Sequence, residues 1–163
     1  MFPEDIQIVA RSIVESASQR GIMLACAESC TGGLLAAALT EIPGSSAVVD
    51  RGFVTYSNEA KMEMLGVPKD LLDAHGAVSE EVARAMAEGV LAQSNAVAAV
   101  SVTGIAGPGG GSALKPVGLV HFAVVGPAGV GHVERRFEDR GREAIRMEAV
   151  RQALGLLLDQ VTG

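Results

Sequence analysis

The feature that most constrains the fold of this chain is the alternation of helical and apolar extended segments over its first two thirds. Apolar side chains three and four residues apart are typical of helices, and short unbroken apolar runs are typical of buried strands. Helices are expected at residues 4–20, 31–40, 58–65, 68–73, 79–94 and 142–161. Strands are expected at residues 22–27, 47–56, 96–102, 117–125 and 131–137.

This order of segments predicts an α/β fold. Alternating strands and helices favour parallel strand pairs, whereas the last two strands flank a short Gly-Pro-Ala-Gly turn and are expected to form an antiparallel hairpin. We therefore expect a single three-layer α/β/α domain, residues 1–163, with a mixed, mostly parallel sheet. Because 48% of the residues are hydrophobic and only 3% are aromatic, the core must consist of Ala, Val, Leu and Ile.

Charge and cysteine content argue against several classes of function. The formal net charge of −6 argues against a nucleic-acid-binding groove, which needs clustered Lys and Arg. The sequence shows neither a signal peptide nor an apolar run of the roughly 18 residues that a membrane span needs. The two cysteines, Cys26 and Cys30, lack the further Cys or His pair of a zinc site. These observations predict a cytoplasmic protein with free thiols, without a metal, a membrane or a nucleic acid as partner.

The turn at residues 27–33, Ala-Glu-Ser-Cys-Thr-Gly-Gly, is the strongest candidate for chemistry. It follows an expected strand and opens an expected helix, and a helix N-terminus offers free backbone N–H groups to a developing anion. Ser29 is one candidate nucleophile, and Cys30 is another because a helix N-terminus lowers the pKa of a thiol. The structural alternatives are a turn serine that bonds its own backbone and a small buried cysteine.

Two further loops follow expected strands, and all three loops share one edge of the sheet if those strands are parallel. Residues 56–61 hold Tyr56, the only tyrosine, and Lys61, which can act as a base only if burial lowers its pKa. Residues 103–116 hold five glycines and could form a nest of N–H groups for an anion. The structural alternatives are a packed phenol, a solvated lysine and a flexible loop.

Arginines crowd the final hairpin and the start of the last helix. One of them reaching the cleft could pair with a phosphate, although a solvated charged face is the alternative. The dipole of a helix disfavours an arginine at its start, which favours a functional reason for Arg142. The arginines of this stretch are Arg135, Arg136, Arg140, Arg142 and Arg146.

Seven motifs, in this order, resemble the CinA C-terminal domain family. They are A-E-S-C-T-G-G (27–33), P-G-S-S (43–46), Y-S-N-E-A-K (56–61), L-G-V-P (65–68), H-G-A-V-S-E-E-V-A (75–83), V-T-G-I-A-G-P-G-G-G (102–111) and K-P-V-G (115–118). The family's characterised activity is the deamidation of nicotinamide mononucleotide. The resemblance implies hydrolysis of that carboxamide to nicotinic acid mononucleotide and ammonia, without a cofactor, in pyridine nucleotide recycling.

The resemblance also implies roles for single residues. Ser29 corresponds to the nucleophile, Lys61 to its base and Tyr56 to an assisting hydroxyl. The expected substrate-binding residues are Cys30, Thr31, Gly32, Gly33, Thr103, Gly104, Gly107 and Arg142. Among these, we expect N–H groups of the helix start to hold the oxyanion, and the resemblance puts Arg142 near the phosphate.

Two alternatives to a serine amidohydrolase stay open at this point. One is a nucleotide-binding module of the same fold without turnover, and the other is an amidohydrolase that uses the Cys30 thiol. In each case the expected partner is a small-molecule nucleotide. The apolar, alanine-rich helices also favour a homo-oligomer such as a dimer.

Overall fold

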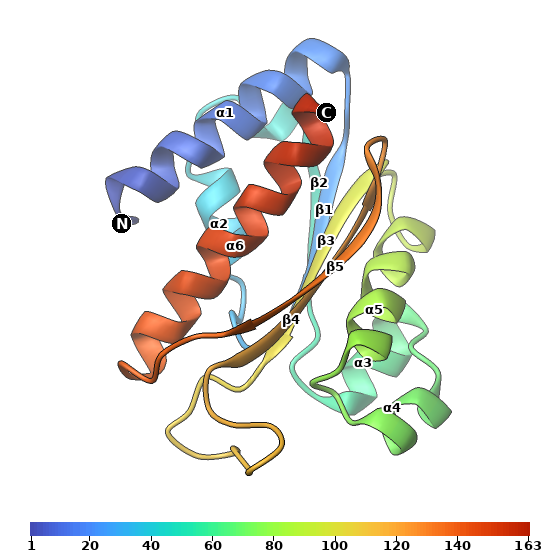
Figure 1. The fold of residues 1–163 in the computed structure, drawn as a ribbon. Coiled ribbons are helices and arrows are strands. Elements are labelled where there is room, and N and C mark those ends of the chain that lie inside the picture. The colour runs from blue at the N-terminus through green and yellow to red at the C-terminus, as the bar shows by residue number, and fades with distance from the viewer.

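The computed structural model describes all 163 residues and has three layers, with helices on both faces of a five-stranded sheet (Figure 1). The helices are α1 (Glu4–Arg20), α2 (Leu34–Thr40), α3 (Asn58–Leu65), α4 (Lys69–His75), α5 (Glu80–Ala92) and α6 (Arg142–Thr162), with a short 3-10 helix, η1 (Ser45–Ala47). The strands are β1 (Leu24–Glu28), β2 (Val49–Val54), β3 (Ala98–Gly104), β4 (Leu119–Gly126) and β5 (Gly129–Arg136). The predicted α/β/α fold is confirmed.

The sheet is mixed, with strand order β2-β1-β3-β4-β5. Strand β1 lies between β2 and β3 and pairs with both in parallel, whereas β4 is antiparallel to β3 and β5. Four strands therefore run in one direction, and β4 alone runs in the other. The carboxyl ends of β1, β2 and β3 meet at one edge of the sheet, so the loops that follow them lie together. Strands β2 and β5 form the two outer edges.

The two faces of the sheet are covered by different sets of helices. Helices α1, α2 and α6 lie on one face, and α3, α4 and α5 lie on the other (Figure 1). The larger core, on the side of α1 and α6, contains 29 buried residues, of which only Phe2 and Phe122 are aromatic. Because almost all of these side chains are aliphatic, the core agrees with what composition predicted.

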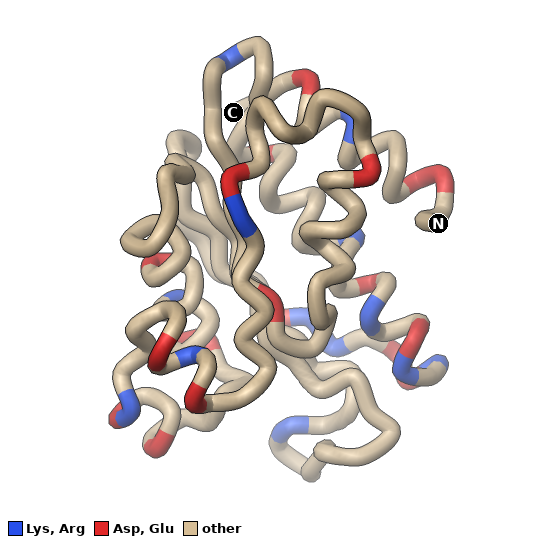
Figure 2. Tube along the Cα trace, turned by 180° about the vertical axis from the view of Figure 1, so that it is seen from behind, with Lys and Arg blue, Asp and Glu red and all other residues tan.

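Charged residues are confined mainly to the outer elements. Acidic and basic positions are interspersed over the helices and loops that surround the sheet (Figure 2). The net charge of −6 is therefore distributed over the surface. None of the helices combines the length and the apolar character that crossing a membrane requires.

Two predicted helix starts that flank the site are confirmed by side-chain caps. The Ser57 hydroxyl accepts a hydrogen bond from the Ala60 N–H at 3.0 Å and begins α3, which carries Lys61. The Ser79 hydroxyl accepts one from the Val82 N–H at 3.3 Å and begins α5. Each cap satisfies an N–H group that the first turn of a helix leaves without a partner.

Helix α2 begins later than the sequence predicts. It was expected from residue 31 but starts at Leu34. The reason is the Glu28 carboxylate, which accepts hydrogen bonds from the N–H groups of Gly33, Leu35 and Ala36 at 2.9–3.1 Å. Gly32 adds a backbone φ of +57°, which favours glycine. Residues 29–33 are therefore a tight turn between β1 and α2.

Candidate active site

The backbone of Ser29 is fixed by both neighbouring strands. Its N–H donates to the Val102 carbonyl at 2.9 Å, so Ser29 extends the pairing of β1 with β3 by one residue. On the other side, the Thr55 N–H donates to the Glu28 carbonyl at 2.9 Å. The side chain of Ser29 therefore emerges at the carboxyl edge of three parallel strands, where ligands bind in open α/β sheets.

Lys61 lies against the Ser29 side chain. It is only 1% exposed, and its Nζ is 3.1 Å from Ser29 Oγ. The same Nζ donates to the Thr55 carbonyl at 2.8 Å and to the Tyr56 carbonyl at 3.5 Å. Burial lowers the pKa of Lys61, because the ammonium ion loses hydration. In the neutral amine, two N–H bonds can serve the carbonyls while the lone pair faces the Ser29 hydroxyl.

A cleft of about 270 Å³ opens in front of this pair. Eight of the residues expected from sequence line it together: Ser29, Cys30, Tyr56, Lys61, Thr103, Gly104, Gly107 and Arg142. They come from the end of β3, from the loops that follow β1, β2 and β3, and from the helices α3, which carries Lys61, and α6, which begins at Arg142. The volume is close to the lower end of the range of small-molecule pockets, about 300–1,000 Å³.

Thr31, Gly32 and Gly33 are not part of the cleft lining, and Thr31 is fully buried. The Gly32 N–H donates to the Ser29 carbonyl at 3.1 Å, and the Gly33 N–H donates to Glu28. These two N–H groups already have acceptors, so they are not available to an oxyanion. Of the N–H groups that were expected to hold the oxyanion, those of Cys30 and Thr31 remain. Only Cys30 lines the cleft.

The glycine loop lines the same cleft and contains N–H groups that are not used within the protein. The N–H groups of Ala106, Gly107, Gly109 and Gly110 donate no hydrogen bond within the protein, and all four residues line the cleft. Arg142 closes this side, because its guanidinium donates to the Gly107 carbonyl at 2.8 Å. The loop can therefore offer several donors to an anion, as backbone nests do.

Tyr56 lies at the rim of the cleft and is 62% exposed. Its hydroxyl accepts a hydrogen bond from Arg142 at 3.1 Å. The contact that Tyr56 makes with Lys61 is through its carbonyl, not its hydroxyl. The structure therefore brings Tyr56 into the site as a partner of Arg142, and its assisting role in the chemistry stays a prediction.

The Cys30 thiol is a poor nucleophile in this structure. Cys30 is 5% exposed, and burial raises the pKa of its thiol to about 12. A thiolate, not a thiol, is the attacking species in cysteine enzymes. Cys30 lines the cleft, but its protonated thiol is not suited to act as the nucleophile.

Two residues position the turn, a role that was expected of neither from the sequence. Glu28 is 1% exposed, and its carboxylate binds the start of α2, as described above. Arg146 of α6 donates to the carbonyls of Cys30 and Thr31 at 3.0 and 3.1 Å. The available signals were an acidic residue at the end of an apolar strand, directly before Ser29, and the position of Arg146 one helical turn after Arg142.

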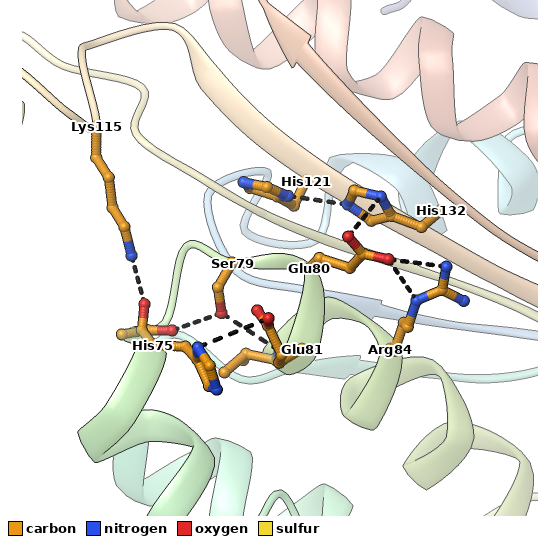
Figure 3. A network of polar contacts seen from close by, with 10 residues as sticks. His75, Ser79, Glu80, Glu81, Arg84, Lys115, His121 and His132 are labelled. Carbon is orange, nitrogen blue, oxygen red and sulfur yellow. Dashed lines mark hydrogen bonds and ion pairs between the residues drawn. The ribbon is translucent and has the colours of Figure 1, made fainter.

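A polar network holds the neighbouring wall of the cleft (Figure 3). Lys115 donates to the His75 carbonyl at the end of α4, and Ser79 donates to the Gly76 carbonyl at 2.8 Å. The imidazoles of His121 and His132 are joined at 2.9 Å, and His132 lies 3.7 Å from the Glu80 carboxylate. The network fixes the segment between α4 and α5, which includes the cleft residues Ala77 and Val78.

The hollow beside this network measures about 310 Å³ and is larger than the cleft at Ser29. Its size does not make it the better candidate, because its acidic and basic side chains already have partners: Lys115 donates to the His75 carbonyl, and Glu80 pairs with Arg84. Glu81 pairs with His75 at 3.6 Å, and Arg136 pairs with Glu134 at 3.0 Å. The pair of a hydroxyl and a desolvated amine is found only in the smaller cleft.

Comparison with known proteins agrees with the motifs. The sequence model of the CinA C-terminal domain matches residues 6–161, which is nearly the whole chain. This chain belongs to the CinA C-terminal domain family. The resemblance drawn from the seven motifs is confirmed. Within this family, the structure of the competence/damage inducible protein CihA from Agrobacterium tumefaciens is 58% identical, has a TM-score of 0.95, and is matched over 98% of this chain and 99% of that chain.

Two relatives illustrate the range of lengths in the CinA family. A CinA-like protein of Anaeromyxobacter sp. (strain K) is 50% identical over 158 residues, which cover 96% of this chain and 38% of the relative. The present chain thus spans less than half the length of such relatives. A protein of Enterobacter agglomerans named nicotinamide-nucleotide amidohydrolase PncC is 55% identical over 130 residues, which cover 80% of this chain and 79% of that protein.

Proposed function

We propose that this protein is an amidohydrolase that converts nicotinamide mononucleotide and water into nicotinic acid mononucleotide and ammonia, in the recycling of pyridine nucleotides. The observation that carries the proposal is the contact of 3.1 Å between Lys61 Nζ and Ser29 Oγ at the floor of a cleft. Support for the substrate comes from the similarity to the PncC amidohydrolase of Enterobacter agglomerans.

In the first step, the neutral Lys61 amine removes the proton of the Ser29 hydroxyl. Ser29 Oγ attacks the carboxamide carbon, and the C=O electron pair moves onto the oxygen. The Cys30 N–H is the donor proposed for this oxyanion, since Cys30 lines the cleft and its N–H donates to no other residue. A fixed donor in a site that excludes water stabilises the developing charge.

In the second step, the tetrahedral intermediate collapses, the C–N bond breaks, and the Lys61 ammonium gives its proton to the leaving nitrogen. Ammonia departs and an ester joins the substrate acid to Ser29. A water molecule then attacks this ester, with Lys61 again taking the proton and returning it to Ser29 Oγ. The carboxylic acid product leaves, and the enzyme regains its starting protonation state.

The phosphate of the substrate is assigned to the glycine loop. Ala106, Gly107, Gly109 and Gly110 line the cleft with N–H groups that donate no hydrogen bond within the protein, and Arg142 supplies a positive charge beside them. Backbone nests and guanidinium groups are both suited to phosphate oxygens. This placement leaves the carboxamide end of the substrate for Ser29.

Ammonia release from the purified protein tests this proposal. Wild-type protein is incubated with nicotinamide mononucleotide, and in parallel with nicotinamide and with the dinucleotide. We expect ammonia from the mononucleotide, and a loss of at least about 10³-fold in Ser29→Ala and Lys61→Met, since a nucleophile and its base act as a unit. Lys69→Met is the matched control, because Lys69 is an exposed lysine paired with Asp73.

Calorimetric titration of the same substrate separates the two classes of function. Binding of the mononucleotide without ammonia release would support the non-catalytic nucleotide-binding module. Full activity of Ser29→Ala would refute the serine mechanism. Full activity of Lys61→Met would refute only the assignment of the base.

A further inference from the structure

The guanidinium of Arg146 binds backbone carbonyls of the turn that follows Ser29. Its guanidinium lies on α6 and is partly buried, and its hydrogen bonds go to two backbone carbonyls, those of Cys30 and Thr31, rather than to a carboxylate. Removing a guanidinium from water is costly unless its donors are well satisfied. Gly32 makes room for it, because a Cβ at that position would lie 3.2 Å from Arg146 Nη2. The turn after Ser29 is therefore built around this side chain.

The Thr31 carbonyl connects Arg146 to Ser29 through two peptide units that are joined by a hydrogen bond. Arg146 Nη2 donates to the Thr31 carbonyl, whose peptide unit ends in the Gly32 N–H. The Gly32 N–H donates to the Ser29 carbonyl at 3.1 Å, and that peptide unit ends in the Cys30 N–H. In a planar trans peptide the N–H points opposite to the C=O. The Cys30 N–H is thus turned away from the inside of the turn, and Cys30 lines the cleft.

We infer that Arg146 is a positioning residue for the reaction, which acts through the Thr31–Gly32 and Ser29–Cys30 peptide units on the Cys30 N–H. This inference rests on the proposed function, in which the Cys30 N–H is the donor that holds the oxyanion. The bond to Arg146 fixes the direction of both peptide units. It also polarises them, since hydrogen bonds in a chain strengthen one another. A more polarised Cys30 N–H is a better donor to the anionic oxygen.

The direct bond from Arg146 Nε to the Cys30 carbonyl completes the arrangement. It fixes the next peptide unit, so that the Cys30 residue is held at its N–H side and at its carbonyl side. Loss of Arg146 leaves Ser29 and Lys61 in place, because Ser29 is bonded to β3 and Lys61 to the end of β2. The expected defect is therefore in stabilisation of the transition state, not in substrate binding.

Steady-state kinetics of Arg146→Gln and Arg146→Lys test this inference. We expect kcat to fall at least about tenfold in Arg146→Gln while KM changes less than about threefold. The loss stays below the 10²–10³-fold that deletion of an oxyanion donor costs, because the donor is displaced and not removed. The kcat of Arg146→Lys should fall less than that of Arg146→Gln, because lysine keeps the positive charge. It should still fall below the wild-type value, because an ammonium group offers no planar fork for two carbonyls. Arg151→Gln is the control, since Arg151 of α6 contacts Asp5 and Glu148.

A second readout does not need the proposed substrate. A fluorophosphonate probe labels an activated serine: the Oγ–P bond forms, fluoride leaves, the serine proton goes to the base, and the phosphoryl oxygen occupies the place of the oxyanion. We expect labelling of Ser29 in the wild-type protein, slowed at least about tenfold in Arg146→Gln and unchanged in Arg151→Gln. If the wild-type protein is labelled at Ser29 but releases no ammonia from nicotinamide mononucleotide, the proposed substrate fails and the role of Arg146 stands.

Three results would overturn the role of Arg146. One is an unchanged kcat and labelling rate in Arg146→Gln. Another is a loss that appears entirely in KM. The third applies if Arg146→Gln does not fold: Arg146→Lys then decides, and wild-type values of kcat and labelling rate in that variant refute the inference.

Discussion

Glu28→Gln is the substitution whose effect on stability can be worked most directly from the structure. It keeps the size of the side chain and replaces one carboxylate oxygen by an NH2 group. In the more favourable orientation, the amide oxygen keeps the bonds to the Gly33 and Leu35 N–H groups. The NH2 group then faces the Ala36 N–H, which loses its acceptor.

The expected loss follows mainly from that contact, because the Cys26 thiol, which lies 3.7 Å from the same oxygen, is a weak donor. A hydrogen bond to a charged group contributes about 1.5–3 kcal/mol, and an unpaired buried donor costs about 1–3 kcal/mol. Because an amide is cheaper to bury than a carboxylate, part of this loss is offset. We therefore expect the free energy of unfolding to fall by about 2–3 kcal/mol. For a chain of this length, that corresponds to a decrease in Tm of about 4–12 °C.

Thermal melting followed by circular dichroism measures this decrease, with urea unfolding at 25 °C as a second determination. Glu59→Gln is the matched control, because Glu59 is an exposed acidic residue in the first turn of α3. Its free energy of unfolding should change by less than about 0.5 kcal/mol. A Tm of Glu28→Gln within about 2 °C of the wild-type value would contradict the view that this carboxylate organises the turn at Ser29.

Three further predictions concern the site and the packing of the helices. The rate of ammonia release should rise with pH, because the active form of Lys61 is the neutral amine. Since burial lowers the pKa of Lys61, the midpoint of the pH–rate curve should lie below the ordinary lysine pKa of about 10.4, and a midpoint at or above that value would contradict this prediction. Cys30→Ala should keep most of the activity, and iodoacetamide should not inactivate the wild-type protein at pH 7, since the thiol pKa is raised to about 12. Gly89→Ala should destabilise the fold by about 1–3 kcal/mol in urea unfolding, because its Cβ would lie 2.1 Å from the Leu65 carbonyl oxygen, whereas Gly155→Ala in open space should stabilise α6 by up to about 1 kcal/mol.

The convergence of three loops could be predicted from sequence because it depends on a general rule. Parallel strands place their carboxyl ends at one edge, and Ser29, Lys61 and Thr103 each lie in or next to a loop that follows such a strand. Their residue types made Ser29 a candidate nucleophile and Lys61 a candidate base, and the family resemblance implied these roles and the contact of Thr103 with substrate. The structure adds the distance and the burial that make the first two a chemical pair.

The details of the turn could not be predicted, because they depend on contacts between distant segments. Arg146 is 116 residues from Cys30, and no local pattern relates them. The sequence pattern placed the start of this helix at residue 31, but α2 begins at Leu34. The pattern does not show that the Glu28 carboxylate caps the helix from the preceding strand. Gly32 and Gly33 were expected to donate to an oxyanion, but their N–H groups are used within the turn. The role of Tyr56 also depends on a partner from α6, Arg142.

The position of β2 at the edge of the sheet has a consequence for inactivation. Lys61 is held by the segment formed by β2 and α3, and within the sheet β2 pairs with β1 alone. Edge segments open locally at a lower free energy than the whole protein unfolds. Ser29, by contrast, follows a central strand. In mild denaturant the base should therefore separate from the nucleophile while the rest of the sheet is still intact, so that activity reports on the least stable segment of the protein and not on its global fold.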